Sequence, residues 1–154
     1  MMKNHVMLFL IPVFGVAMFS GCFGPPKPDG LPPTHPCVIT ITQSGEPLAS
    51  ASVRMKSEDE SLQGWLVAGF TGEDGKARMW THGKWEGAPL GKFKVTVEKF
   101  QNEGPEENPT GVYLIVAKKY TEVDTTDLEM EVVKKGKNEM TFDVGAPVKD
   151  RVRN

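Results

Sequence analysis

The strongest constraint on the fold is an alternation of apolar and polar side chains with a period of two residues. It is clearest over residues 92–99, where Phe93, Val95 and Val97 alternate with lysine, threonine and glutamate. Successive side chains of a β-strand point to opposite faces, so the pattern predicts a strand between a core and water. No segment keeps the period of an amphipathic helix, so we expect an all-β fold. The alternation recurs at 37–42, 51–56, 128–133 and 139–144.

Turn residues divide these segments into a chain of short strands. Residues 44–47, Ser-Gly-Glu-Pro, predict a hairpin between the first two strands. A more evenly apolar run at 65–71 is followed by a turn at 73–76, from which residues 77–82 return. A further strand is expected at 112–117, after a proline-bounded loop at 101–110. We therefore predict an antiparallel β-sandwich of seven to eight strands over residues 37–145 and a frayed polar tail over 146–154.

Residues 1–21 differ from the rest of the chain because Lys3 is their only charged side chain. An apolar stretch of 14 residues runs from Val6 to Phe19. That length is short of the roughly 20 residues needed to span a bilayer as a helix. A thin basic start, an apolar centre and small residues after it are typical of a secretory signal peptide.

The end of this segment, Phe19-Ser20-Gly21-Cys22, resembles the bacterial lipobox, although the lipobox usually has leucine where Phe19 stands. The resemblance implies that the chain is cut before Cys22 and that a diacylglycerol is attached to its thiol. More than one acyl chain anchors a protein stably, so we expect a lipid-anchored protein of the bacterial cell envelope. Phe23, in place of aspartate, favours the outer membrane over the inner one by the sorting rule of enteric bacteria. An ordinary cleaved signal and a buried N-terminal helix are the alternatives.

Residues 22–36 read as a tether between Cys22 and the domain. Six of the 14 residues at 23–36 are prolines, which favour an extended polyproline II conformation. At about 3.1 Å per residue the tether would reach up to roughly 40 Å above the lipid. A proline-rich ligand for a partner domain is the alternative interpretation.

Several turn and strand motifs are similar to those of carboxypeptidase-regulatory-like and transthyretin-like (prealbumin-like) domains, over roughly 38–144. The resemblance implies a β-sandwich of that type, and the later residues look like a bacterial lipoprotein branch of the group. Because the motifs concern turns and strands, they imply a fold and no particular activity. They are Gly45-Glu46-Pro47-Leu48, Thr71-Gly72-Glu73-Asp74-Gly75-Lys76-Ala77 and Pro89-Leu90-Gly91-Lys92-Phe93.

Catalytic, cofactor and metal motifs are not found, so we expect no enzyme activity, no cofactor and no metal. A hydroxyisourate hydrolase of the transthyretin-like fold needs a C-terminal Tyr-Arg-Gly-Ser, whereas this chain ends in Val-Arg-Asn. Iron-binding dioxygenases with a related sandwich use two tyrosines and two histidines, and His35, His82, Tyr113 and Tyr120 match only that count. Cys37 is left without a disulfide partner once Cys22 is acylated, and we expect it to pack as a small apolar residue.

The tryptophans are the one suggestive feature for binding. We expect Trp65 in the core, Trp80 on one strand face with Arg78 and His82, and Trp85 in the following loop. Trp80, Trp85, His82 and Arg78 could form a platform for a sugar ring or an envelope protein, or could simply cap the end of the sandwich.

These features favour a non-catalytic binding, adaptor or structural module at the envelope. The alternatives are a carbohydrate-binding module, an enzyme acting on a small molecule or glycan, and a subunit that pairs a lysine-free sheet edge with a partner strand. A net charge of −2 gives no case for nucleic-acid binding.

Overall fold

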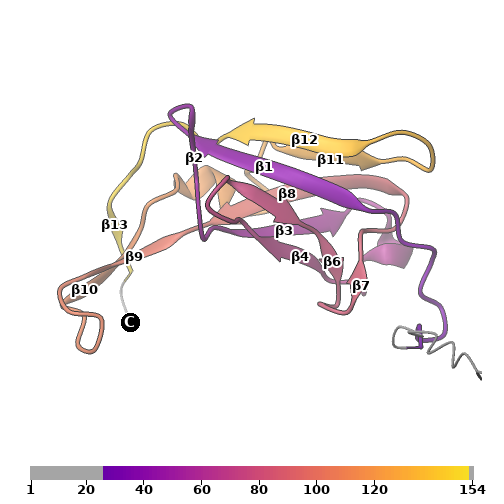
Figure 1. Cartoon of the computed structure of the whole chain (residues 1–154), viewed down its shortest axis with the longest axis horizontal. Coiled ribbons are helices and arrows are strands. Elements are labelled where there is room, and N and C mark those ends of the chain that lie inside the picture. Colours follow the sequence, from indigo (N-terminus) through magenta and orange to yellow (C-terminus); the bar gives the residue numbers. More distant parts are fainter. Residues whose placement is uncertain (1–25, 153–154) are drawn as a thin grey trace, which may run out of the picture.

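The computed structural model describes residues 26–152, which form an all-β fold (Figure 1). Its helical elements are two single 3-10 turns, η1 (Glu60–Leu62) and η2 (Lys118–Tyr120). Within the described range, no helix has the length and apolarity needed to cross a bilayer. The expected signal peptide, 1–21, and Cys22 lie outside the described residues.

The first sheet is centred on the strand that opens the domain. Its members are β1 (Cys37–Gln43), β2 (Glu46–Pro47), β5 (Lys76–Arg78) and β12 (Asn138–Asp143). β1 pairs antiparallel with β2 and β5 on one side and parallel with β12 on the other. The prediction of a wholly antiparallel fold is therefore wrong at β1 and β12. A parallel pair needs a long connection, and here nearly the whole domain lies between the two strands.

The second sheet has six strands, and its neighbours all run antiparallel. Central β8 carries the alternation that the sequence showed best, and the inward positions of Phe93, Val95 and Val97 are confirmed by exposures of 2%, 0% and 0%. In spatial order the strands are β11 (Glu129–Val132), β8 (Gly91–Glu98), β3 (Ser52–Ser57), β4 (Val67–Phe70), β6 (Trp80–Thr81) and β7 (Trp85–Glu86).

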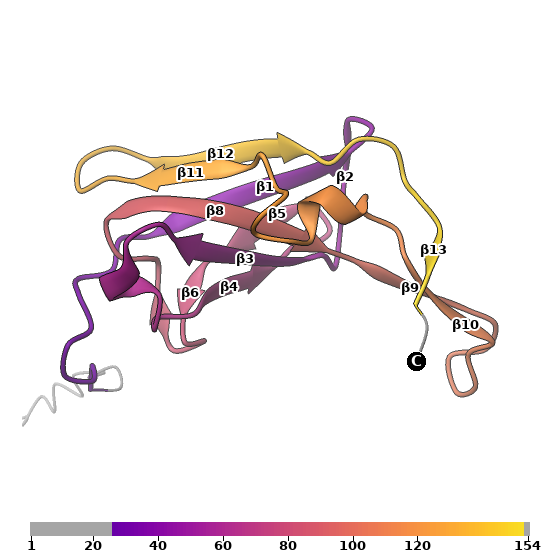
Figure 2. The same cartoon turned by 180° about the vertical axis from the view of Figure 1, so that it is seen from behind.

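The expected hairpin between residues 37–42 and 51–56 is wrong, because β1 and β3 belong to different sheets. Ser44 and Gly45, with φ of 53° and 83°, turn the chain into β2, which pairs with β1 over only two residues. The chain then crosses to the second sheet, where β3 pairs with β4 and β8. This crossing places the apolar sides of β1 and β3 in one core (Figure 2).

The segment after the 73–76 turn joins the two sheets along one side. β5 pairs with β1, whereas β6, only two residues later, pairs with β4. Met79 lies between them, is fully buried, and donates its N–H to the Cys37 carbonyl at 3.1 Å. Gly69 of β4 allows the close approach, because a Cβ there would lie 2.4 Å from the Arg78 carbonyl oxygen.

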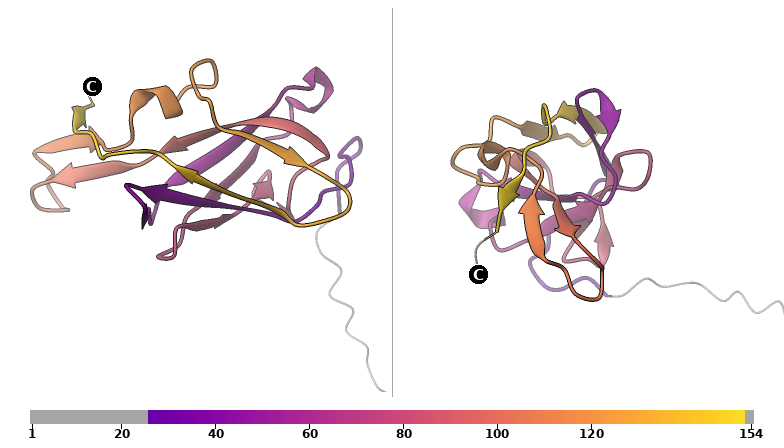
Figure 3. Two further views of the ribbon diagram at one scale, coloured as in Figure 1. Left: turned by 90° about the horizontal axis from the view of Figure 1, so that it is seen from above. Right: turned by 90° about the vertical axis from the view of Figure 1, so that its left-hand side faces the viewer.

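A third sheet forms an arm at one end of the molecule. It contains β9 (Phe100–Glu103), β10 (Gly111–Leu114) and β13 (Asp150–Arg151). The prediction of a frayed tail over 146–154 is wrong for residues 148–152, because the Val148 and Val152 amides donate to Ile115 and Val112 at 3.1 and 2.9 Å. β10 pairs with β9 along one edge and with β13 along the other, so the polar residues of the tail form a strand there. The arm lies opposite the tether (Figures 1 and 3).

The end of the expected tether is part of the fold. His35 donates its N–H to the Ala88 carbonyl at 2.8 Å and accepts the Ala88 N–H at 3.0 Å. The Asn138 side-chain amide donates to the Pro36 carbonyl at 3.3 Å. Residues 26–30 are exposed, whereas Leu31, Pro32 and Thr34 are half-buried. Within residues 26–152, the part of the chain that packs on the domain therefore begins close to residue 31 rather than at 37.

Candidate binding groove

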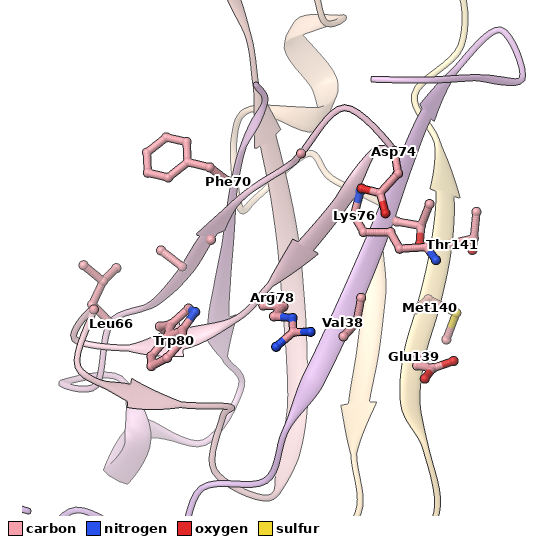
Figure 4. Close-up of a pocket in the computed structure, with 15 residues that line it drawn as sticks. Val38, Leu66, Phe70, Asp74, Lys76, Arg78, Trp80, Glu139, Met140 and Thr141 are labelled. Atoms are coloured by element: carbon pink, nitrogen blue, oxygen red, sulfur yellow. The ribbon is translucent and has the colours of Figure 1, made fainter. Parts of the chain in front are cut away.

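A shallow groove of about 1280 Å³ runs along one outer face of the molecule (Figure 4). Its wall comes from β4 and β6, and its floor comes from the outward-facing residues of β1 and β5 and from the edge strand β12. Val38 and Thr40 of β1 alternate with Cys37, Ile39 and Ile41, which point into the core. The strand alternation therefore builds the core and the groove on opposite faces of the same sheet.

Large apolar side chains line the groove although they face solvent. Phe70 is 74% exposed, Leu66 56%, Met140 41% and Trp80 37%. These four are half of the eight large apolar side chains exposed among residues 26–152. Scattered exposed apolar residues are ordinary, but several gathered in one concave surface mark a binding site.

Charged groups in the groove supply hydrogen-bond donors and acceptors without a strong net charge. Lys76 and Arg78 occupy successive outward positions of β5, and Asp74 and Glu139 lie at the same groove. The Arg78 guanidinium is 3.9 Å from the Glu86 carboxylate, and its side chain is 75% exposed. Such an exposed pair contributes little to stability, so the guanidinium stays accessible to a ligand.

The four residues expected to form one platform divide between two neighbouring clusters. Arg78 and Trp80 line the groove. His82 leaves the strand direction with φ of 51°, and its ring meets those of Trp65 and Trp85 edge-on, with centroids 5.3 and 6.4 Å apart. Its Nε2 lies 3.2 Å from the Gly64 carbonyl oxygen.

The expectation that Trp65 lies in the core is wrong. Trp65 is half-buried, because the loop before β4 sets its ring against His82 at the rim of the sheet. Met140, expected to point inward, is 41% exposed because β12 is an edge strand of its sheet. Leu66 and Phe70 were missed as groove residues. The evenly apolar run at 65–71 was their one signal, since it lacks the polar positions of a strand facing water.

The groups with clearly shifted pKa values do not converge in the groove. The hydrogen bond from Lys149 lowers the pKa of Glu103, and the one from Lys94 lowers the pKa of Glu129. Both carboxylates belong to exposed ion pairs on other surfaces. Within residues 26–152, no group of three or more histidine, cysteine, aspartate or glutamate side chains could hold a metal.

Cys37 packs in the core at 3% exposure, as expected. Burial raises the pKa of its thiol to about 12, because the charged thiolate is poorly solvated there. A thiol with so high a pKa is a poor nucleophile at neutral pH.

Comparison with known proteins returns no match to any protein-family model, curated protein or solved structure. The chain's own residues are therefore the guide to its function, and the groove between β4, β5 and β12 is the surface that they point to.

Proposed function

We propose that the chain is a non-catalytic, lipid-anchored β-sandwich module of the bacterial cell envelope that binds a partner or ligand in the groove. The observation that carries the proposal is the gathering of Leu66, Phe70, Trp80 and Met140 in one solvent-facing groove. Among the described residues, no threonine or lysine side chain of the lining donates a hydrogen bond to a carboxylate or a histidine. Binding needs such an apolar surface, whereas covalent catalysis needs a nucleophile and base in contact.

The anchor in this proposal is Cys22. The apolar segment at 6–19 and the small residues before Cys22 support export and acylation, with the outer membrane favoured over the inner one. Acylation of Cys22 would make the membrane lipid a constant partner of the protein.

The fold type in this proposal is a transthyretin-like sandwich. Two sheets that share one buried core support it, as do the turn motifs. In the 71–77 motif, Gly75 has φ of 72° and Thr71 pairs with Ala77, which is the turn that the motif implies.

Carbohydrate binding is a second candidate function for the groove. The exposed rings of Trp80 and Phe70 favour it, because sugar rings stack on aromatic faces while Lys76 and Arg78 could donate to hydroxyl groups. An envelope protein would instead cover the apolar wall as a protein interface does.

Tryptophan fluorescence tests the carbohydrate candidate. Addition of glycans or cell-wall fragments should quench or shift the emission of the wild type, and Trp80→Phe should lose that response. Trp85→Phe is the matched control, because Trp85 does not line the groove. No response across a broad panel would exclude the carbohydrate candidate.

Binding of an envelope protein is tested with a variant of a groove residue. Phe70→Ser should abolish crosslinking of the full-length protein to an envelope protein in cells, whereas Phe100→Ser should not. Phe100 is also exposed, at 52%, but does not line the groove. Equal crosslinking in both variants would contradict the groove as the interface.

A further inference from the structure

The two ends of the molecule differ in chemistry. The end that meets the tether carries β6 with Trp80 and β7 with Trp85. The half-buried Trp65 lies at the same end, because its ring packs against the ring of His82. These are all three tryptophans of the chain. The opposite end is the arm, whose hairpin loop at 104–110 includes Glu106 and Glu107 and contains no aromatic residue (Figures 1 and 2).

Hydrogen bonds hold the tether beside three loops at this end. The tether pairs through His35 with Ala88, three residues after Trp85. The loops 64–66 and 82–85 are joined because the His82 N–H donates to the Leu66 carbonyl at 2.7 Å. The turn at 133–137 is held by Asn138, whose side chain bonds both Val133 and the Pro36 carbonyl. Tether, aromatic loops and turn therefore form one surface, the tether end.

The turn adds a cluster of three lysines to the tether end. Lys134, Lys135 and Lys137 are all exposed, and within residues 26–152 none of them is in an ion pair. Acidic residues 58–60 lie at the same end, but η1 and the turn occupy separate corners of it (Figure 3). Leu66 is 56% exposed and Val133 40%, so apolar groups accompany the lysines.

The tether length keeps this end close to an anchor at Cys22. Because the described chain packs on the domain from about residue 31, a spacer between that point and Cys22 has at most nine residues, 22–30. At about 3.1 Å per residue they span at most roughly 28 Å, less than the 40 Å expected from the full proline-rich segment.

We propose that the tether end docks on an anionic lipid bilayer and that the arm points away from it. The lysines of the 133–137 turn contact anionic headgroups, where each contributes about a fivefold gain in surface affinity. Trp65 and Trp85 lie at the level of the headgroups, a position that tryptophan prefers. The inference rests on the proposed lipid anchor, which supplies the high local concentration of membrane. In this orientation the groove opens to the side, where a ligand can reach it.

The test uses the acylated full-length product in vesicles of phosphatidylethanolamine and phosphatidylglycerol that contain brominated lipid. Flotation reports the anchor, and quenching of tryptophan fluorescence by bromine reports docking. We expect quenching in the wild type and in Trp80→Phe, since Trp65 and Trp85 remain. Lys134→Gln/Lys135→Gln should lower the equilibrium constant for docking by roughly 30-fold.

The matched control is Lys99→Gln/Lys118→Gln, which removes the same charge away from the tether end and should leave the quenching unchanged. Protein that floats with the vesicles but shows no quenching would overturn the docking proposal and leave the anchor intact. Protein that does not float would contradict the anchor itself. Equal loss of quenching in both lysine variants would show a response to net charge and would also overturn the proposed surface.

Discussion

At the residue scale, Thr71 connects two loops of the core. Its buried hydroxyl accepts the Ala51 N–H at 2.8 Å and donates to the Leu48 carbonyl at 2.6 Å. Thr71→Val keeps the shape but leaves a buried donor and acceptor unpaired. We expect the free energy of unfolding, measured with urea, to fall by about 1–3 kcal/mol.

Thr110→Val is the control for that change. The Thr110 hydroxyl also donates to a carbonyl, that of Glu103 at 3.0 Å, but it is exposed, so water can replace it. Equal losses in the two variants would contradict the role given to burial.

Cys37 gives a second prediction at this scale. Because burial raises the pKa of its thiol to about 12, the thiolate is scarce in the folded protein. In a Cys22→Ala protein, Cys37 is the one remaining thiol of the chain. A thiol reagent at pH 8 should modify it only as fast as the protein unfolds, and should react at once in urea. Rapid reaction of the folded protein would show that the thiol is accessible.

At the scale of elements, Asp143 at the end of β12 ties β12 to the turn after β1. Its carboxylate accepts the Gly45 N–H at 2.7 Å, the Thr42 hydroxyl at 2.8 Å and the Gly145 N–H at 2.8 Å. These hydrogen bonds, the one from Gly45 first, lower the pKa of Asp143. A lowered carboxyl pKa stabilises the fold above the ordinary value of about 3.9, and that contribution disappears as the pH falls through the folded value.

Asp143→Ala should therefore lower the urea midpoint at pH 7, and the difference from the wild type should shrink at acid pH. Asp124→Ala is the control, because within residues 26–152 the Asp124 side chain has no hydrogen-bond or ion-pair partner. A difference that stays constant from pH 7 to pH 2 would contradict the assigned role of the carboxylate.

The local pattern of apolar and polar residues predicted single strands well, but it did not predict which strands pair with each other. The alternation of Phe93, Val95 and Val97 placed β8 correctly because burial of one strand face is a local property. The parallel pairing of β1 with β12 could not be predicted from the residues of either strand, because the paired residues are about a hundred positions apart in the sequence. The positive φ of Ser44 is equally hidden, because serine seldom adopts it.

At the scale of the whole molecule, the platform expected from the sequence shares only two of its four residues with the groove. Arg78 and Trp80 were identified because charged and aromatic side chains on a strand face are conspicuous. Leu66 and Phe70 were not identified, because an apolar residue in a strand is usually expected to lie in the core. Only the tertiary structure shows which strand faces are left uncovered. The tail over 148–152 was misjudged for a related reason, since its pairing with β10 depends on backbone groups rather than on side-chain type.

The proposed anchor at Cys22 would hold the whole molecule at the envelope. It is tested most directly by metabolic labelling of cells with a fatty-acid analogue, followed by membrane fractionation of wild type and Cys22→Ala. We expect labelled wild type in the membrane fraction and unlabelled Cys22→Ala outside it. Unlabelled wild type, or label that survives in Cys22→Ala, would contradict acylation of Cys22.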